Sequence, residues 1–231
     1  NTNGSNKVEA GQPLFTLKFK AVRAGKLSES LYMTPEGISA EATTENDEIQ
    51  KVELKFIQNG IAMDSKLEDL MPVLRFASDS TAPSRTPEVR SCADWLVQKF
   101  QSLGLEVTLH ETLGHPVVLA RNAHQIGRRT VLIYGHYDVQ PPEPLEEWKS
   151  PAFEPTIRDG RIYCRGATDN KGQFMAHLKG IEELLTADGD VPVNLIFLIE
   201  GEEEIGSPNL RPFLEAHRDY LRCDVVAISD T

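Results

Sequence analysis

Cysteine is scarce in this sequence, and its spacing excludes small disulfide-rich scaffolds and zinc ribbons. The chain of 231 residues holds three cysteines, Cys92, Cys164 and Cys223, far apart and without a C-x-x-C motif. This spacing gives neither an even disulfide set nor the ligand pairs of a zinc ribbon. We therefore expect three small buried side chains, and a reducing compartment is favoured.

The sequence also lacks long apolar runs and an excess of positive charge. No stretch approaches the roughly 20 apolar residues of a membrane-spanning helix, and the polar start NTNGSNKVEAG does not resemble a signal peptide. The 24 basic residues face 35 acidic ones, so the formal net charge is −11. An acidic surface disfavours nucleic acid and anionic membranes, and we expect neither as a partner.

Residues 1–57 differ from the rest of the chain in their pattern of apolar and polar residues. LFTLKFKAV and IQKVELKFI alternate apolar and polar residues with the period of a half-buried strand. This segment resembles the last strands of cohesin-like β-sandwich modules. It holds none of the candidate site residues, so we expect a β-rich N-terminal segment, of open origin, outside the catalytic architecture.

Residues 58–231 alternate helical and strand patterns. A helix is expected to begin at Thr86 as N-cap with Pro87 in its first position, and to end at Gly104. Further helices are expected over 64–78, 170–187 and 207–221, and strands over 105–111, 115–122, 130–135, 158–166, 193–200 and 224–229. The nearly uninterrupted apolar strands predict an α/β fold, a mostly parallel sheet with helices on both faces.

Polar groups follow the predicted strands in four places. They are His136 and Asp138, then Asp169, then Glu202, Glu203 and Glu204, and finally Asp230. Because the carboxyl ends of parallel strands meet at one edge of a sheet, we expect these groups to converge there. Crowded carboxylates repel one another unless a cation compensates them. Histidine and carboxylate ligands suit zinc, with manganese or cobalt as alternatives.

The strings GHYDVQP, RGATDNKG and EGEEEIGS, followed by ISDT, occur in this order along the chain. In this combination the sequence resembles the zinc exopeptidase family of carnosinases, cytosolic nonspecific dipeptidases, acetylornithine deacetylases and carboxypeptidase G. The resemblance covers residues 64–231. Gln140, the prolines after it and Trp148 resemble the dipeptidase branch in particular. The resemblance to this family implies that residues 58–231 form the N-terminal half of a metallopeptidase catalytic domain.

The resemblance also implies roles for individual residues. It implies four metal ligands in a site for two zinc ions: His136, Asp169, Glu204 and Asp230. Asp169 would bridge the two ions, with a cis peptide bond after it. Glu203 would be the general base, and Asp138 would orient the imidazole of His136. Glu202 matches a variable position, and we expect a structural or solvated carboxylate there.

The expected function is metal-dependent hydrolysis of a peptide or amide bond, most simply by a dipeptidase. One alternative is an N-acyl amino-acid deacylase of the same family. Another is a non-catalytic metal-binding or interaction module, because the resemblance implies a further histidine ligand and a lid domain that this sequence does not contain. That lid would mediate a homodimer. We expect a cytoplasmic protein, or a secreted one if the cohesin-like resemblance holds.

Overall fold

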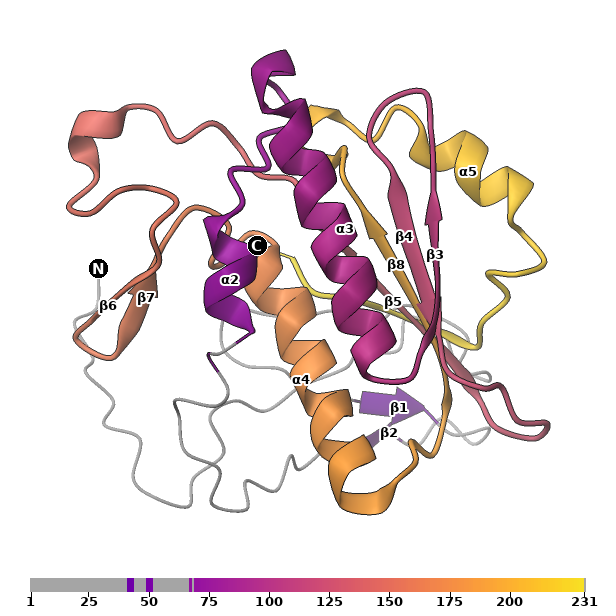
Figure 1. Ribbon diagram of the computed structural model, residues 1–231. Coiled ribbons are helices and arrows are strands. Elements are labelled where there is room, and N and C mark those ends of the chain that lie inside the picture. The colour runs from indigo at the N-terminus through magenta and orange to yellow at the C-terminus, as the bar shows by residue number, and fades with distance from the viewer. Residues whose placement is uncertain (1–40, 44–48, 52–66, 68, 231) are drawn as a thin grey trace.

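The structure is a computed structural model that describes residues 41–43, 49–51, 67 and 69–230 (Figure 1). Of the N-terminal segment it describes two short strands, β1 (Glu41–Thr43) and β2 (Ile49–Lys51), which pair antiparallel. The strand predicted over 14–22 and most of the segment with the cohesin-like resemblance lie outside the described residues. That resemblance therefore stays a prediction.

Five strands form the central sheet in the order β3-β4-β8-β5-β9. Their bounds are Glu106–His110 for β3, Val117–Arg121 for β4, Thr130–His136 for β5, Asn194–Glu200 for β8 and Val225–Ile228 for β9. β8, β5 and β9 run parallel, as predicted, whereas β3 and β4 are antiparallel to each other and β4 to β8. The β3–β4 connection is too short for the crossover that parallel strands need.

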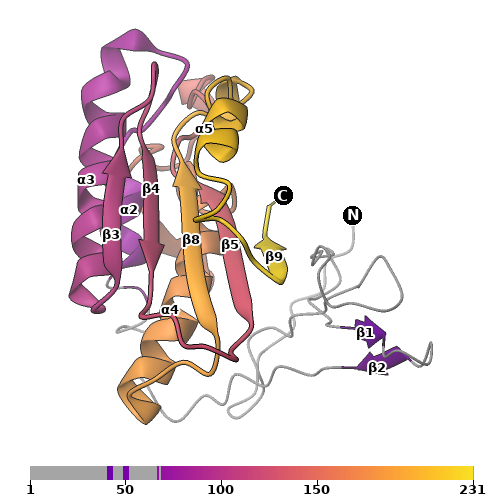
Figure 2. The ribbon, with the colours of Figure 1, turned by 90° about the vertical axis from the view of Figure 1, so that its right-hand side faces the viewer.

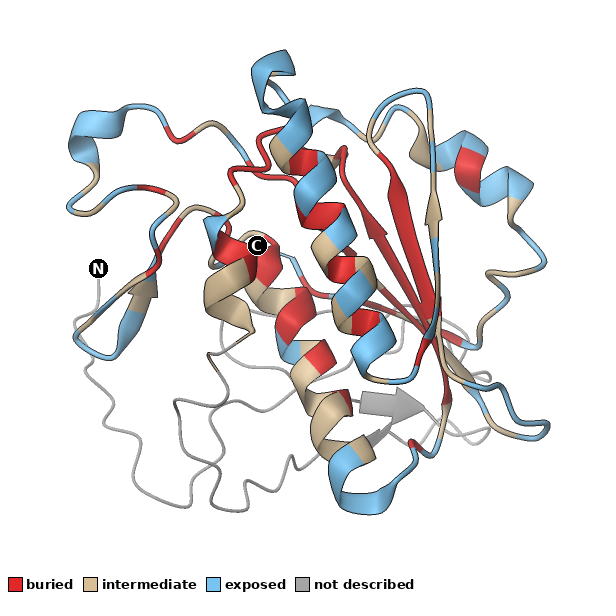
Figure 3. Cartoon of the chain, viewed as in Figure 1, coloured by how far each residue is buried: buried red, intermediate tan, exposed pale blue. Residues whose placement is uncertain are grey.

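Helices cover both faces of this sheet, which confirms the predicted α/β fold (Figures 1 and 2). α3 (Thr86–Ser102) and α4 (Lys171–Asp188), with α2 (Leu70–Arg75) beside α4, lie on one face, and α5 (Leu210–Ala216) lies on the other. Alternate residues of β8 enter the two cores: Phe197 packs on the α3 side and Leu198 on the α5 side. Every residue of β8 is buried (Figure 3), as expected for a strand covered on both faces.

Several helix boundaries differ from the predicted ones: α2 ends at Arg75 rather than at residue 78, and α5 ends at Ala216 rather than at residue 221. Arg85 is the N-cap of α3 and Thr86 is its first residue, because the 3-10 turn η1 (Pro83–Arg85) runs directly into the helix. α5 begins at Leu210 rather than near Ser207, whose positive φ of 50° does not fit a right-handed helix. α4 begins and ends one residue later than the predicted range 170–187, and Gly189 after it adopts the left-handed conformation.

The remaining elements are short. η2 (Leu145–Glu147) precedes a hairpin of β6 (Thr156–Arg158) and β7 (Arg161–Tyr163), and η3 (Glu203–Ile205) follows β8. The hairpin turns at Asp159 and Gly160, both with positive φ, which is the usual conformation of an Asp-Gly turn. Among the described residues, no helix combines the length and the apolar character that a membrane span needs.

Candidate metal centre

The carboxyl ends of β5, β8 and β9 bring the candidate ligands together. His136 is the last residue of β5, η3 carries Glu203 and Glu204, and Asp230 follows β9. One possible ligand atom from each of His136, Asp169 and Asp230 lies within 4.8 Å of the others. A second set with the same spacing joins His136 to Glu203 and Glu204.

The imidazole of His136 is fully buried, and the contacts of its Nδ1 with Asp138 fix the orientation of the ring. Nδ1 lies 3.1 Å from the carbonyl oxygen of Asp138 and 3.3 Å from its Oδ1. Both atoms are acceptors, so Nδ1 donates and the lone pair of the neutral ring belongs to Nε2. Among the described residues Nε2 has no hydrogen-bond partner, although Oδ1 of Asp169 lies 3.2 Å from it and Oδ1 of Asp230 3.7 Å.

This buried Nε2 makes no hydrogen bond among the described residues and lies beside several carboxylates, so it is suited to bind a cation. Burial lowers the pKa of His136, but the carboxylates of Asp138, Asp230 and Glu203 outweigh burial and raise this pKa to about 9. A divalent cation would satisfy the same carboxylates and use the Nε2 lone pair directly. The donor set of one imidazole and several carboxylates suits zinc, manganese or cobalt.

The carboxylates of the cluster are electrostatically strained. Partial burial, together with neighbouring carboxylates, raises the pKa of Asp169, Glu203 and Glu204 above the usual range. Within the described parts of the chain, no lysine or arginine forms an ion pair with these three groups. Negative charge gathered without a neighbouring lysine or arginine is the usual electrostatic setting of a metal site.

Asp138 connects His136 to η3, the turn that carries Glu203 and Glu204. Its carboxylate is fully buried and accepts hydrogen bonds from the backbone N–H groups of Glu203 at 3.2 Å and Glu204 at 3.0 Å. The hydroxyl of Ser80 donates a third bond of 2.6 Å. One carboxylate therefore fixes both the imidazole of His136 and the start of η3.

Part of the chain matches a known family of peptidases. Residues 132–230 match peptidase family M20/M25/M40. The matched region begins in β5 and ends at Asp230, so it contains every candidate site residue.

Relatives and solved structures agree with this match. The chain is 36% identical over 158 residues, or 63% of its length, to a Cys-Gly metallodipeptidase of Schizosaccharomyces pombe. Human carnosine dipeptidase 1 superposes with a TM-score of 0.69 at 32% identity, and the metallo-carboxypeptidase Sso-CP2 of Sulfolobus solfataricus with 0.67 at 40% identity; each match covers 73% of this chain. The chain spans 33% of the yeast dipeptidase and 38% of each of these two structures.

Two features that the resemblance to this family implies are present in the structure. The peptide bond between Asp169 and Asn170 is cis, as predicted. Glu202 is a buried structural carboxylate, because it accepts hydrogen bonds from the backbone N–H of His115 at 2.9 Å and from the amide of Asn209. It joins the loop before β4 to the segment before α5.

Three residues that contact this cluster were not among the predicted site residues. Ser80 reaches Asp138 because Asp79 pairs with Val139 in an isolated parallel bridge. Asn170 bonds to both His136 and Asp230, and Gln140 donates to Oε2 of Glu204 at 2.6 Å. Gln140 had a signal, since it lies in the GHYDVQP string, but Ser80 lies far from every motif.

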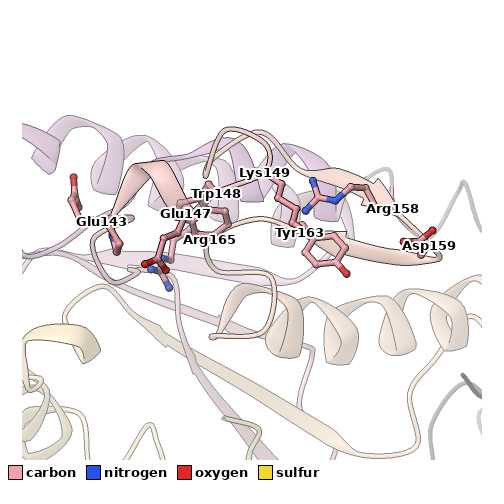
Figure 4. Close-up of a pocket in the computed structure, with 9 residues that line it drawn as sticks. Glu143, Glu147, Trp148, Lys149, Arg158, Asp159, Tyr163 and Arg165 are labelled. Atoms are coloured by element: carbon pink, nitrogen blue, oxygen red, sulfur yellow. The ribbon is translucent and has the colours of Figure 1, made fainter. Parts of the chain in front are cut away.

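The segment after Gln140 borders a pocket of about 590 Å³ between η2 and the β6–β7 hairpin (Figure 4). Trp148 and Arg165 line it, with the guanidinium 5.5 Å from the ring centre. The indole N–H donates to the carbonyl of Pro142 at 2.7 Å, and Nη2 of Arg165 donates to that of Pro141 at 2.9 Å. Two side chains thus hold the residues directly after Gln140.

Proposed function

We propose that this chain carries the active-site residues of a metallopeptidase that hydrolyses dipeptides with the help of two divalent cations, zinc in the first instance. The observation that supports this most directly is the buried Nε2 of His136, without a hydrogen bond among the described residues and beside the carboxylates of Asp169 and Asp230. Residues 58–231 would be a catalytic portion, with residues 1–57 outside it.

The proposed ligands are His136, Asp169, Glu204 and Asp230, with Asp169 shared between two cations. When bound, the cations would polarise the carbonyl of the scissile bond and acidify a water molecule. Asp138 holds His136 in the tautomer that leaves Nε2 available, and its bonds to η3 place Glu203 and Glu204. These contacts orient the ligands before any substrate arrives.

Glu203 is the proposed general base. Its carboxylate accepts no hydrogen bond from the described residues and lies 3.8 Å from Nε2 of His136, whereas Glu204 is bonded to Gln140. A carboxylate without a fixed donor is free to take a proton from water and return it to the leaving amine. Glu203 therefore serves proton transfer, and Glu204 serves binding.

Calorimetric titration of zinc into the metal-free full-length protein, followed by assays with dipeptides and N-acyl amino acids, tests this proposal. We expect zinc binding that is lost in His136→Ala and kept in His124→Ala, whose ring lies at the other edge of the sheet beside Leu195. Hydrolysis of N-acyl amino acids alone would favour the deacylase, and zinc binding without hydrolysis would favour a binding module. Absence of zinc binding would contradict the proposal.

A further inference from the structure

The side-chain amide of Asn170 lies between the two strand ends that carry His136 and Asp230. Asn170 precedes α4 and is 1% exposed. Its Oδ1 accepts the backbone N–H of His136 at 3.2 Å. Its Nδ2 donates to Oδ1 of Asp230 at 3.0 Å and to the backbone carbonyl of Ser229. One buried amide thus uses both ends to join two candidate ligands.

The backbone hydrogen bonds of the sheet do not make this connection. The paired register of β5 and β9 ends at Tyr134 and Ile228. His136 and Asp230 lie two residues beyond that last pair, where the ladder no longer sets the distance between the strands. The amide of Asn170 takes its place, because it bonds to both chains beyond the last pair.

The surroundings leave room for this amide and little else. A Cβ added at Gly135 would lie 2.7 Å from Oδ1 of Asn170 and 3.0 Å from Cβ of Phe174. The first contact is shorter than real Cβ atoms show and the second is tighter than most, so the close approach of the amide to β5 depends on glycine. Gly135 and Asn170 therefore form one packed unit at the end of β5.

We propose that Asn170 is a positioning residue that sets the spacing of His136 and Asp230, and with it the affinity for the cation that these two bind. This inference rests on the proposed function. Asn170 acts through the two ligands, because it holds the backbone of one and the carboxylate of the other. Residues that orient metal ligands typically contribute about 10–100-fold in metal affinity.

The chain offers a matched control at the opposite edge of the same sheet. Asn194 is also buried, and its amide also joins separate segments. Its Nδ2 donates to the carbonyls of Gln125 at 3.1 Å and Arg128 at 3.2 Å, and its Oδ1 accepts the N–H of Gln125 at 2.7 Å. It touches no candidate ligand, so its replacement should affect stability alone.

The experiment compares Asn170→Leu, Asn170→Asp and Asn194→Leu in the full-length protein. Zinc affinity is measured by calorimetry, the cobalt-substituted site by visible absorption, and folding by the melting temperature of the metal-free protein. We expect Asn170→Leu to weaken zinc binding by at least about tenfold and to change the cobalt spectrum. Asn170→Asp keeps the acceptor for His136 N–H and should recover part of the affinity. Asn194→Leu should lower the melting temperature with zinc affinity and cobalt spectrum unchanged.

Wild-type zinc affinity and cobalt spectrum in Asn170→Leu would overturn the inference, as would an equal loss of affinity in Asn194→Leu. Should Asn170→Leu fail to fold, Asn170→Asp decides: a dissociation constant equal to that of the wild type would overturn the inference. Failure of the wild type to bind zinc would instead overturn the proposed function, and this inference with it. The two failures are therefore distinguishable.

Discussion

The two ends of the central strands, the amino edge and the carboxyl edge of the sheet, hold carboxylates in opposite environments. At the amino edge of β8, Asp190 pairs with Arg128 and Glu106 with Arg121, and these arginines hold the pKa of both carboxyls below the usual range. At the carboxyl edge the pKa is raised in each of three groups: Asp169, Glu203 and Glu204. The same fold therefore neutralises acids at one edge and concentrates them at the other.

The raised pKa values at the carboxyl edge have a consequence for stability. A carboxyl with a raised pKa favours its protonated form in the folded state, so its ionisation at neutral pH costs stability. Asp190 and Glu106, which pair with arginines, have lowered pKa values. Their ionised forms therefore stabilise the folded protein at neutral pH, and this contribution is lost as the pH falls. A cation bound at the carboxyl edge would relieve the repulsion among Asp169, Glu203 and Glu204, with which no described lysine or arginine forms an ion pair.

Among substitutions at the carboxyl edge, the largest effect is expected for Glu203→Gln. The amide keeps the size of the side chain but cannot take a proton, so kcat for a dipeptide should fall by about 10²–10⁴-fold. Elemental analysis should find the metal content unchanged, because Glu204 still binds.

The neighbouring Glu202→Gln is the matched control. Glu202 holds His115 and Asn209, so this variant should lose some thermal stability and keep its kcat. If Glu202→Gln were inactive with its metal bound while Glu203→Gln stayed active, the assignment of Glu203 as the general base would be wrong.

The second prediction concerns the stability that a cation supplies. Zinc at about 100 times its dissociation constant should stabilise the folded protein by about 2.7 kcal/mol, measured as a rise in melting temperature that a chelator reverses. Arg128→Met breaks the Asp190 pair at the amino edge and should lower the melting temperature slightly without changing the rise caused by zinc. A rise that disappears in Arg128→Met would mean that the two edges are not electrostatically separate.

The third prediction concerns Asp138, which accepts bonds from Ser80, Glu203 and Glu204. In Asp138→Asn an amide group would face these donors, and the imidazole of His136 would lose its anionic partner. We expect zinc affinity to fall by about 10–100-fold in calorimetry. Asp190→Asn removes a carboxylate at the amino edge instead and should leave the affinity unchanged. Equal losses in both variants would indicate a general loss of charge rather than a specific support.

The sequence predicted the sheet and the convergence of polar groups for a physical reason. Parallel strands end at one edge, so residues at or just after their ends, such as His136 and Asp230, must lie close whatever the details of packing. The roles of individual residues came from the resemblance and stay proposals.

Contacts made by side chains across the fold were beyond the reach of sequence patterns. Ser80 reaches Asp138 only through the bridge of Asp79 with Val139, and Asn170 reaches Asp230 only because β9 stops pairing before it. Ser80 lies outside every motif, and Asn170 lies in the string RGATDNKG, but its partner Asp230 is 60 residues away and no local pattern joins the two. The start of α3 was misplaced for a similar reason, since η1 continues into it.

The smallest expected effect belongs to Trp148, which acts on the cluster through two intermediates. Trp148→Phe keeps a ring near Arg165 but removes the N–H that bonds Pro142, the second residue after Gln140. Because a single neutral hydrogen bond contributes about 1 kcal/mol, and Gln140 is only one support of Glu204, we expect zinc affinity to weaken less than about fivefold.

Trp95→Phe is the control, since Trp95 lies on α3 against Phe76 and touches no candidate ligand. Calorimetry should find its affinity equal to that of the wild type. A loss in Trp148→Phe as large as that in Asp138→Asn would show that the residues after Gln140 support the cluster more strongly than one neutral hydrogen bond accounts for. The boundary of the cation site would then extend to the pocket beside the β6–β7 hairpin.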